Sequence, residues 1–90
     1  MIINGKDHRE ILEKIIKHYG PEHQRIKACE ELAELQVELH HNSRHGVLEE
    51  MADVYIMLEQ VKKIYKIQKN ELTDMMEAKL QRTERLINDN

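Results

Sequence analysis

The sequence predicts an all-α protein with a single domain over residues 1–90, and three observations support this prediction. Only one proline and three glycines occur in the chain, and 34% of its residues are charged, a composition typical of helical proteins and not of disordered ones. Apolar residues recur at three- and four-residue intervals, as on the buried face of an amphipathic helix. Turn-forming residues interrupt this pattern at spacings that suit a four-helix bundle.

The first predicted helix follows a short lead-in at residues 1–6, with Asp7 expected as its N-cap. Gly20 is expected to end it, and Pro21 suits the first position of a second helix over about residues 21–41. The apolar stripe of the first helix consists of Ile11, Leu12, Ile15, Ile16 and Tyr19.

The polar residues 42–46 predict a turn into a third helix over about residues 47–67. This helix is apolar on several sides, which is typical of a helix buried against more than one neighbour, and Glu59 is expected on its solvent side. Asn70 is expected to cap a fourth helix over about residues 71–88. A chain this short buries only about 60–65% of its unfolded surface. We therefore expect a homo-oligomer, a dimer or a tetramer, to complete the bundle.

The composition argues against several classes of protein. A net charge of −3 gives no basic field to attract nucleic acid or an anionic membrane. Tryptophan and phenylalanine are absent, which weakens any platform for stacking bases. No apolar run approaches the roughly 18 residues of a membrane span. The single Cys29 cannot form an internal disulfide, so we expect a reduced, cytoplasmic protein without nucleic-acid or membrane partners.

Two carboxylate pairs stand at three-residue spacing, Glu31 with Glu34 and Glu50 with Asp53. Residues three apart share one face of a helix, so an antiparallel hairpin would bring the four acids together. Such a group is stable in a helical core only around a cation. Glu50 and Asp53 fall inside the apolar arc of their helix, which is typical of a functional site. Oxygen ligands of this kind suit Mg²⁺, or Mn²⁺ in its place, and we predict a magnesium site.

The acids form the pattern Glu30-Glu31-x-x-Glu34 followed by Glu50-x-x-Asp53. This pattern resembles the EExxE…ExxD signature of the MazG-like, all-α nucleoside triphosphate pyrophosphohydrolases. Over about residues 11–85 the chain is similar to small phage and prophage members of that family. The runs that carry this similarity are HYGPEHQ, EEMADVYIMLEQ and Lys79-x-x-Arg82-x-x-Arg85. The resemblance implies Mg²⁺-dependent hydrolysis of a nucleoside triphosphate to a monophosphate and pyrophosphate.

The resemblance also implies roles for single residues. The implied metal ligands are Glu31, Glu34, Glu50 and Asp53. Glu30, the remaining acid of the pattern, looks like a partner of the metal site or the catalytic base that orients water. Lys79 and Arg82 look like phosphate contacts. Gln24, beside His23 in the first turn of the second helix, is a candidate contact for the nucleotide.

Other interpretations stay open at this point. The acids of the second helix are also typical of a solvated face, and the chain would then be a non-enzymatic helical oligomerisation or binding module. A di-iron carboxylate bundle needs Glu-x-x-His pairs on facing helices, and Glu38-x-x-His41 is the single such pair in view. His40 and His45 complete a histidine cluster that would form a zinc site without thiols. Lys79 lies inside an apolar stripe, where its stem can be buried with its charge in water.

Overall fold

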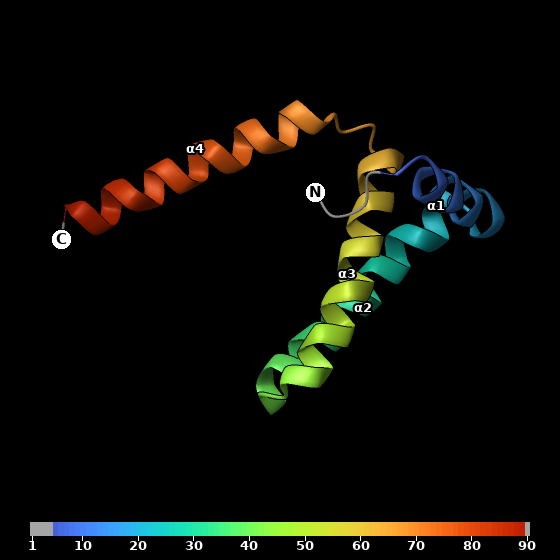
Figure 1. The fold of residues 1–90 in the computed structure, drawn as a ribbon, viewed down its shortest axis with the longest axis horizontal. Helices are drawn as coiled ribbons and strands as arrows, with labels where there is room; N and C mark the ends of the chain where they lie inside the picture. Colours follow the sequence, from blue (N-terminus) through green and yellow to red (C-terminus); the bar gives the residue numbers. More distant parts are fainter. Residues whose placement is uncertain (1–4, 90) are drawn as a thin grey trace.

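The computed structural model describes residues 5–89, and these form four α-helices without a strand. The all-α prediction is confirmed. The helices are α1 (Lys6–Tyr19), α2 (Pro21–His41), α3 (Arg44–Ile64) and α4 (Lys69–Asn88). As Figure 1 shows, α2 and α3 form an antiparallel hairpin, α1 packs at one end of it, and α4 extends away. Residues 1–4 of the expected lead-in lie outside the described residues.

Two predicted N-caps are wrong by a few residues. Gly5 precedes α1, so Asp7 lies in the first turn, where its charge is favourable at the positive end of the helix dipole. At α4 the N-cap is Gln68 and not Asn70, because Glu71 accepts a hydrogen bond of 2.7 Å from the Gln68 N–H. This bond satisfies one backbone donor at the helix start, which is what fixes the boundary.

The turn between α2 and α3 is shorter than predicted. Asn42 takes a left-handed conformation with φ 54°, which ends α2. Ser43 then caps the next helix by accepting a hydrogen bond of 3.2 Å from the Gly46 N–H, so α3 begins at Arg44. Gly46 therefore lies inside α3, and a β-carbon there would overlap the Glu38 side chain. The overlapping atoms are the carboxylate end of Glu38, so a side chain at position 46 would require Glu38 to turn aside.

The core is small and lies where α1, α2 and α3 meet. Its buried apolar residues are Leu12, Ala28, Val54 and Met57. Between α2 and α3 the core also contains an amide pair, in which Gln24 Nε2 donates a hydrogen bond of 2.8 Å to Gln60 Oε1. Because each amide meets the other, neither is left unsatisfied at a buried position.

Glu59 is buried, and its predicted place on the solvent side of α3 is wrong. Only 8% of its surface is exposed, and its carboxylate forms an ion pair of 3.1 Å with Lys62. The reason is tertiary, since α1 packs against α3 and removes this side of the helix from water. The helical periodicity of α3 cannot predict where α1 packs.

Helix α4 packs against none of the other three helices, and every residue in it is exposed. Figure 1 shows it as a separate arm that leaves the hairpin after the α3–α4 loop. Its uncovered apolar side chains are Leu72, Met75, Met76, Leu80, Leu86 and Ile87. One chain therefore does not close a four-helix bundle by itself. Among the residues described, no helix has the length and apolar character needed to cross a membrane.

Candidate metal centre

Three of the four predicted metal ligands converge on the α2–α3 hairpin. One carboxylate oxygen each from Glu31, Glu50 and Asp53 lies within 4.8 Å of the other two. Glu50 and Asp53 share a face of α3 because three residues separate them. Glu31 reaches the same point from α2 because the two helices run antiparallel side by side. Glu31 is buried, Glu50 is half-buried and Asp53 is at the exposed edge of the group.

Two oxygens of this group are buried without a hydrogen-bond partner among the described residues, Glu31 Oε2 and Glu50 Oε2. Leaving a buried acceptor unpaired costs about 1–3 kcal/mol, and more when the group is charged. A hard divalent cation bound at these oxygens would remove that cost, and carboxylates are the ligands that such cations prefer. The donor set therefore fits a hard divalent cation.

The electrostatics of the cluster point the same way. Desolvation, followed by the charges of Glu34, Asp53 and Glu31, raises the pKa of Glu50 to about 6. Desolvation also raises the pKa of Asp53, and the neighbouring Glu31 charge adds to that rise. Both effects mean that the carboxylates resist ionisation together. At neutral pH the cluster is thus a site of excess negative charge that a cation would stabilise.

Glu34 and Glu30 are placed differently from the other acids. Glu34 is exposed and is outside the converging group, although it is near enough to affect the pKa of Glu50. Glu30 is also exposed, and its carboxylate is 3.4 Å from Lys27 Nζ. Their predicted roles as ligand and catalytic base stay predictions.

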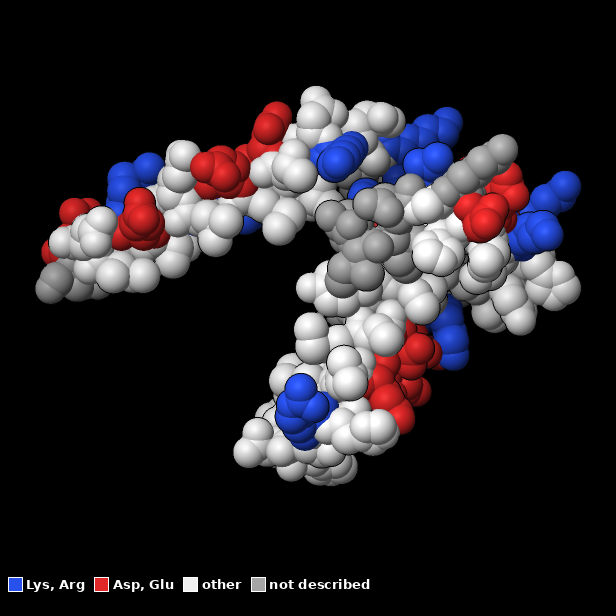
Figure 2. All heavy atoms as spheres, in the orientation of Figure 1, with Lys and Arg blue, Asp and Glu red and all other residues white. Residues whose placement is uncertain are grey.

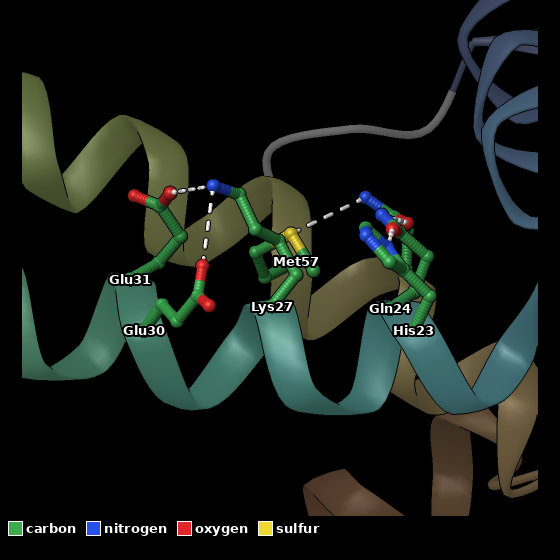
Figure 3. Close-up of polar contacts among 7 residues, drawn as sticks. His23, Gln24, Lys27, Glu30, Glu31 and Met57 are labelled. Atoms are coloured by element: carbon green, nitrogen blue, oxygen red, sulfur yellow. Dashed lines mark hydrogen bonds and ion pairs between the residues drawn. The ribbon is translucent and has the colours of Figure 1, made fainter. Parts of the chain in front are cut away.

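Lys27 is the residue of this region that the sequence analysis missed. Its Nζ lies between two carboxylates, 3.4 Å from Glu30 and 3.3 Å from Glu31, as Figure 3 shows. The hydrogen bonds to Glu31 and Glu30 raise the pKa of Lys27. Lys27 occupies Oε1 of Glu31, so Oε2 is the oxygen left for a metal. The signal was present in the sequence, because Lys27 precedes these acids by three and four residues.

The predicted substrate contacts do not lie at the acids within one chain. Gln24 is 4% exposed, and its amide is engaged by Gln60 and, at 2.7 Å, by His23 Nδ1. It is a core residue here, and its contact with a nucleotide stays a prediction. Lys79 and Arg82 are exposed on α4, which does not pack on the hairpin. A single chain therefore does not bring them to the carboxylates.

The histidines do not form a second metal site in the described part of the chain. His40, His41 and His45 are all exposed, and no metal-sized group of ligand atoms includes them. His45 Nε2 instead lies 2.7 Å from Glu49 one turn later on the same helix. The zinc interpretation therefore has no geometric support here.

The chain was compared with models of protein families, with curated protein sequences and with solved structures, and none of them matched. The chemistry of the site therefore has to be inferred from this chain's own residues. Their arrangement offers three carboxylates to one hard cation, with an ammonium group beside them.

Proposed function

We propose that the protein is a Mg²⁺-dependent nucleoside triphosphate pyrophosphohydrolase that cleaves between the α and β phosphates. The observation that supports this most is the convergence of Glu31, Glu50 and Asp53 within 4.8 Å. Two buried and unpaired carboxylate oxygens in that group add to the support. The choice of substrate class rests on the resemblance of the acidic pattern to the MazG-like family. Mn²⁺ is expected to substitute for Mg²⁺.

The protein's own residues would hold the metal and shape its surroundings. Glu31 and Glu50, whose unpaired oxygens are buried, would hold the metal together with Asp53, which lies at the exposed edge of the group. Lys27 holds the other oxygen of Glu31 and so orients that carboxylate. At the border of the site, Glu34 is proposed as a further metal ligand and Glu30 as the base that orients water. When bound, Mg²⁺ neutralises charge on the phosphates and activates or orients the attacking water.

A homo-oligomer is part of this proposal. Most of the stability of a helix in a protein comes from the packing of its amphipathic face, and α4 has an uncovered apolar stripe that needs a partner. We expect a second copy of the chain to cover it, in a dimer or a tetramer. Lys79 lies within that stripe, so covering the stripe would also bring Lys79 and Arg82 of one copy toward another copy. In this arrangement they would contact the substrate's phosphates.

The test is an assay of the purified protein in the presence of Mg²⁺ with a panel of ribonucleoside and deoxyribonucleoside triphosphates. Nucleoside monophosphate, pyrophosphate and orthophosphate are measured separately. We expect monophosphate and pyrophosphate in equal amounts, no turnover in EDTA, and recovery with Mg²⁺ or Mn²⁺. Orthophosphate with nucleoside diphosphate as main products would contradict cleavage between the α and β phosphates.

A second function is favoured by one observation, the fully exposed α4. If no triphosphate is turned over and no divalent cation binds, the chain is a helical oligomerisation or binding module. In either function we place it in the cytoplasm, where the exposed free thiol of Cys29 is kept reduced.

A further inference from the structure

A second polar region lies at the other end of the hairpin, beside α1, the end of α3 and the loop that leads into α4. There the structure has a pocket of about 960 Å³. Its cationic lining residues are Arg9, Lys17, Lys62, Lys63, Lys66 and Lys69. Figure 2 shows lysine and arginine gathered over this junction, while aspartate and glutamate mark the hairpin arm below it.

The charge of this pocket is opposite to that of the chain as a whole. Of the residues that the structure describes, six cations and two carboxylates line it, although the net charge of the chain is −3. The two carboxylates are already engaged, Glu59 with Lys62 at 3.1 Å and Glu13 with Lys63 at 3.5 Å. Lys17, Lys66 and Lys69 are exposed, so water screens their charges, but cations gathered around one hollow still give it a positive potential that attracts an anion.

Three lysines of the pocket are left without an ion-pair partner among the described residues: Lys17, Lys66 and Lys69. They come from α1, from the α3–α4 loop and from the first position of α4. Lys66 has φ 57°, a left-handed conformation that a lysine rarely adopts. This conformation ends α3, because the Lys66 N–H donates to the Lys63 carbonyl at 3.2 Å and the Ile67 N–H donates to the Lys62 carbonyl at 2.9 Å. The helix end thereby fixes the backbone of a residue that lines the pocket.

The apolar lining and the volume of the pocket indicate which class of ligand would fit. Apolar side chains, among them Leu12, Ile16 and Ile64, line it together with the cations. Its volume falls in the range of about 300–1,000 Å³ that is usual for small-molecule sites. The cations surround one hollow instead of following a stripe, and the chain has neither tryptophan nor phenylalanine for base stacking. A compact anion therefore fits better than a nucleic-acid strand.

We propose that this pocket binds an oligophosphate group, either free or carried by a nucleoside, at a site separate from the acidic cluster. None of the three converging carboxylates lines the pocket. The nearest lining residue on α3 is Glu59, six residues beyond Asp53, which is about 9 Å along the helix axis. Binding here needs no divalent cation, because lysines contact phosphate directly. The proposal does not depend on the hydrolase activity.

The experiment is calorimetric titration of the full chain with sodium tripolyphosphate and, separately, with ATP, in buffer containing EDTA. Without metal the acidic cluster repels phosphate, so binding measured in EDTA does not come from that cluster. We expect both probes to bind. Equal affinities identify the phosphates as the whole ligand, and tighter binding of ATP shows that the nucleoside also contacts the apolar floor. If neither tripolyphosphate nor ATP shows binding at millimolar concentration, the proposal is overturned.

Matched variants distinguish binding in the pocket from non-specific attraction of anions by surface cations. The triple variant Lys17→Ala, Lys66→Asn, Lys69→Ala removes three pocket cations and should weaken binding at least about tenfold. The control Lys14→Ala, Arg44→Ala, Arg85→Ala removes three exposed cations outside the pocket and should bind like the parent chain. Equal losses in both triple variants overturn the proposal.

Two further measurements guard the interpretation. Lys66→Asn alone suits the left-handed backbone, so it keeps the fold and should still weaken binding if the triple variant does not fold. Asp53→Asn should bind tripolyphosphate without metal as the parent does. Clearly tighter binding, as expected when one repulsive charge near the anion is removed, would place the anion at the acidic cluster and overturn the separate site. Binding of a single-stranded oligonucleotide in the absence of any binding by the two small probes would also overturn it.

Discussion

Helices α3 and α4 are neighbours in the chain with almost equal lengths, 21 and 20 residues, but their surroundings differ. α3 packs against α1 and α2 and buries Val54 and Met57. α4 also has an apolar stripe, yet every one of its residues is exposed. The difference is in the neighbours and not in the local pattern. An amphipathic pattern thus predicts that a helix face will be covered, but not which chain will cover it.

The largest expected effect is the loss of activity when a carboxylate of the α2–α3 hairpin is neutralised, compared with the same change on α4. Asp53→Asn keeps the size of the side chain and removes one charge and one hard-cation ligand. We expect kcat/KM with Mg²⁺ to fall at least about 100-fold, because metal and charge stabilisation supply several kcal/mol. The stability of the metal-free protein should stay level or rise, since one repulsive charge is gone.

The matched control for that variant is Asp74→Asn on the exposed α4. It makes the same chemical change on a helix that packs against nothing in its own chain, and its kinetics should equal those of the parent. If Asp53→Asn is as active as Asp74→Asn, the converging acids are a solvated face and the proposed metal site is wrong.

The next largest effect is a change in oligomeric state when the apolar stripe of α4 is altered. Met76→Glu places a charge in the apolar stripe and should shift the assembly toward monomer, measured by light scattering at micromolar concentration. Ala78→Glu makes a charge on a different face of the same helix and should leave the assembly unchanged. A parent chain that is monomeric and fully active at that concentration would refute the oligomer.

A smaller effect is expected at Lys79, the cation within the stripe of α4. Lys79→Ala should raise KM about tenfold, the loss of roughly one charge-assisted contact with phosphate. The affinity for Mg²⁺, measured by calorimetry without nucleotide, should stay near that of the parent. A change in metal affinity with an unaltered KM would mean that Lys79 acts on the acids and not on the substrate.

The smallest effect is a pH dependence in the metal-free protein. Folding raises the pKa of Glu50 from its ordinary 4.5 to about 6, so between these values the folded state binds more protons than the unfolded state. The stability that Glu50 contributes therefore falls as the pH rises through that window. Glu50→Gln cannot ionise, so in EDTA its Tm should exceed that of the parent at neutral pH and match it at about pH 4. An equal gain at both pH values would exclude titration as the cause.

Much of the hairpin could be predicted from the sequence. The bounds of α2 were correct, because Gly20 and Pro21 are strong local signals at its start. The convergence of Glu31 with Glu50 and Asp53 follows from three-residue spacing and an antiparallel turn, and both can be read from the chain. These features depend on residues close together in sequence.

What could not be predicted depends on contacts distant in sequence. Glu59 is buried because α1 packs against α3, and no periodicity of α3 reveals that. The sequence also could not predict that α4 extends away from the hairpin. Its apolar stripe is the same whether a helix of the same chain or of another copy packs against it. Lys27 was visible in spacing, but its importance depends on Glu31 being buried, which is a tertiary fact.

The buried amide pair of Gln24 and Gln60 has a consequence for the alignment of the two helices. Glu31 lies seven residues after Gln24 on α2, and Asp53 lies seven residues before Gln60 on α3. Seven residues are about two helical turns, so the amides and the acids occupy equivalent heights on one antiparallel face. A slip of one helix by a single turn would break the buried hydrogen bond between the two amides and would also separate the acids. The glutamine pair thus stabilises the one alignment of α2 and α3 in which Glu31 lies beside Glu50 and Asp53.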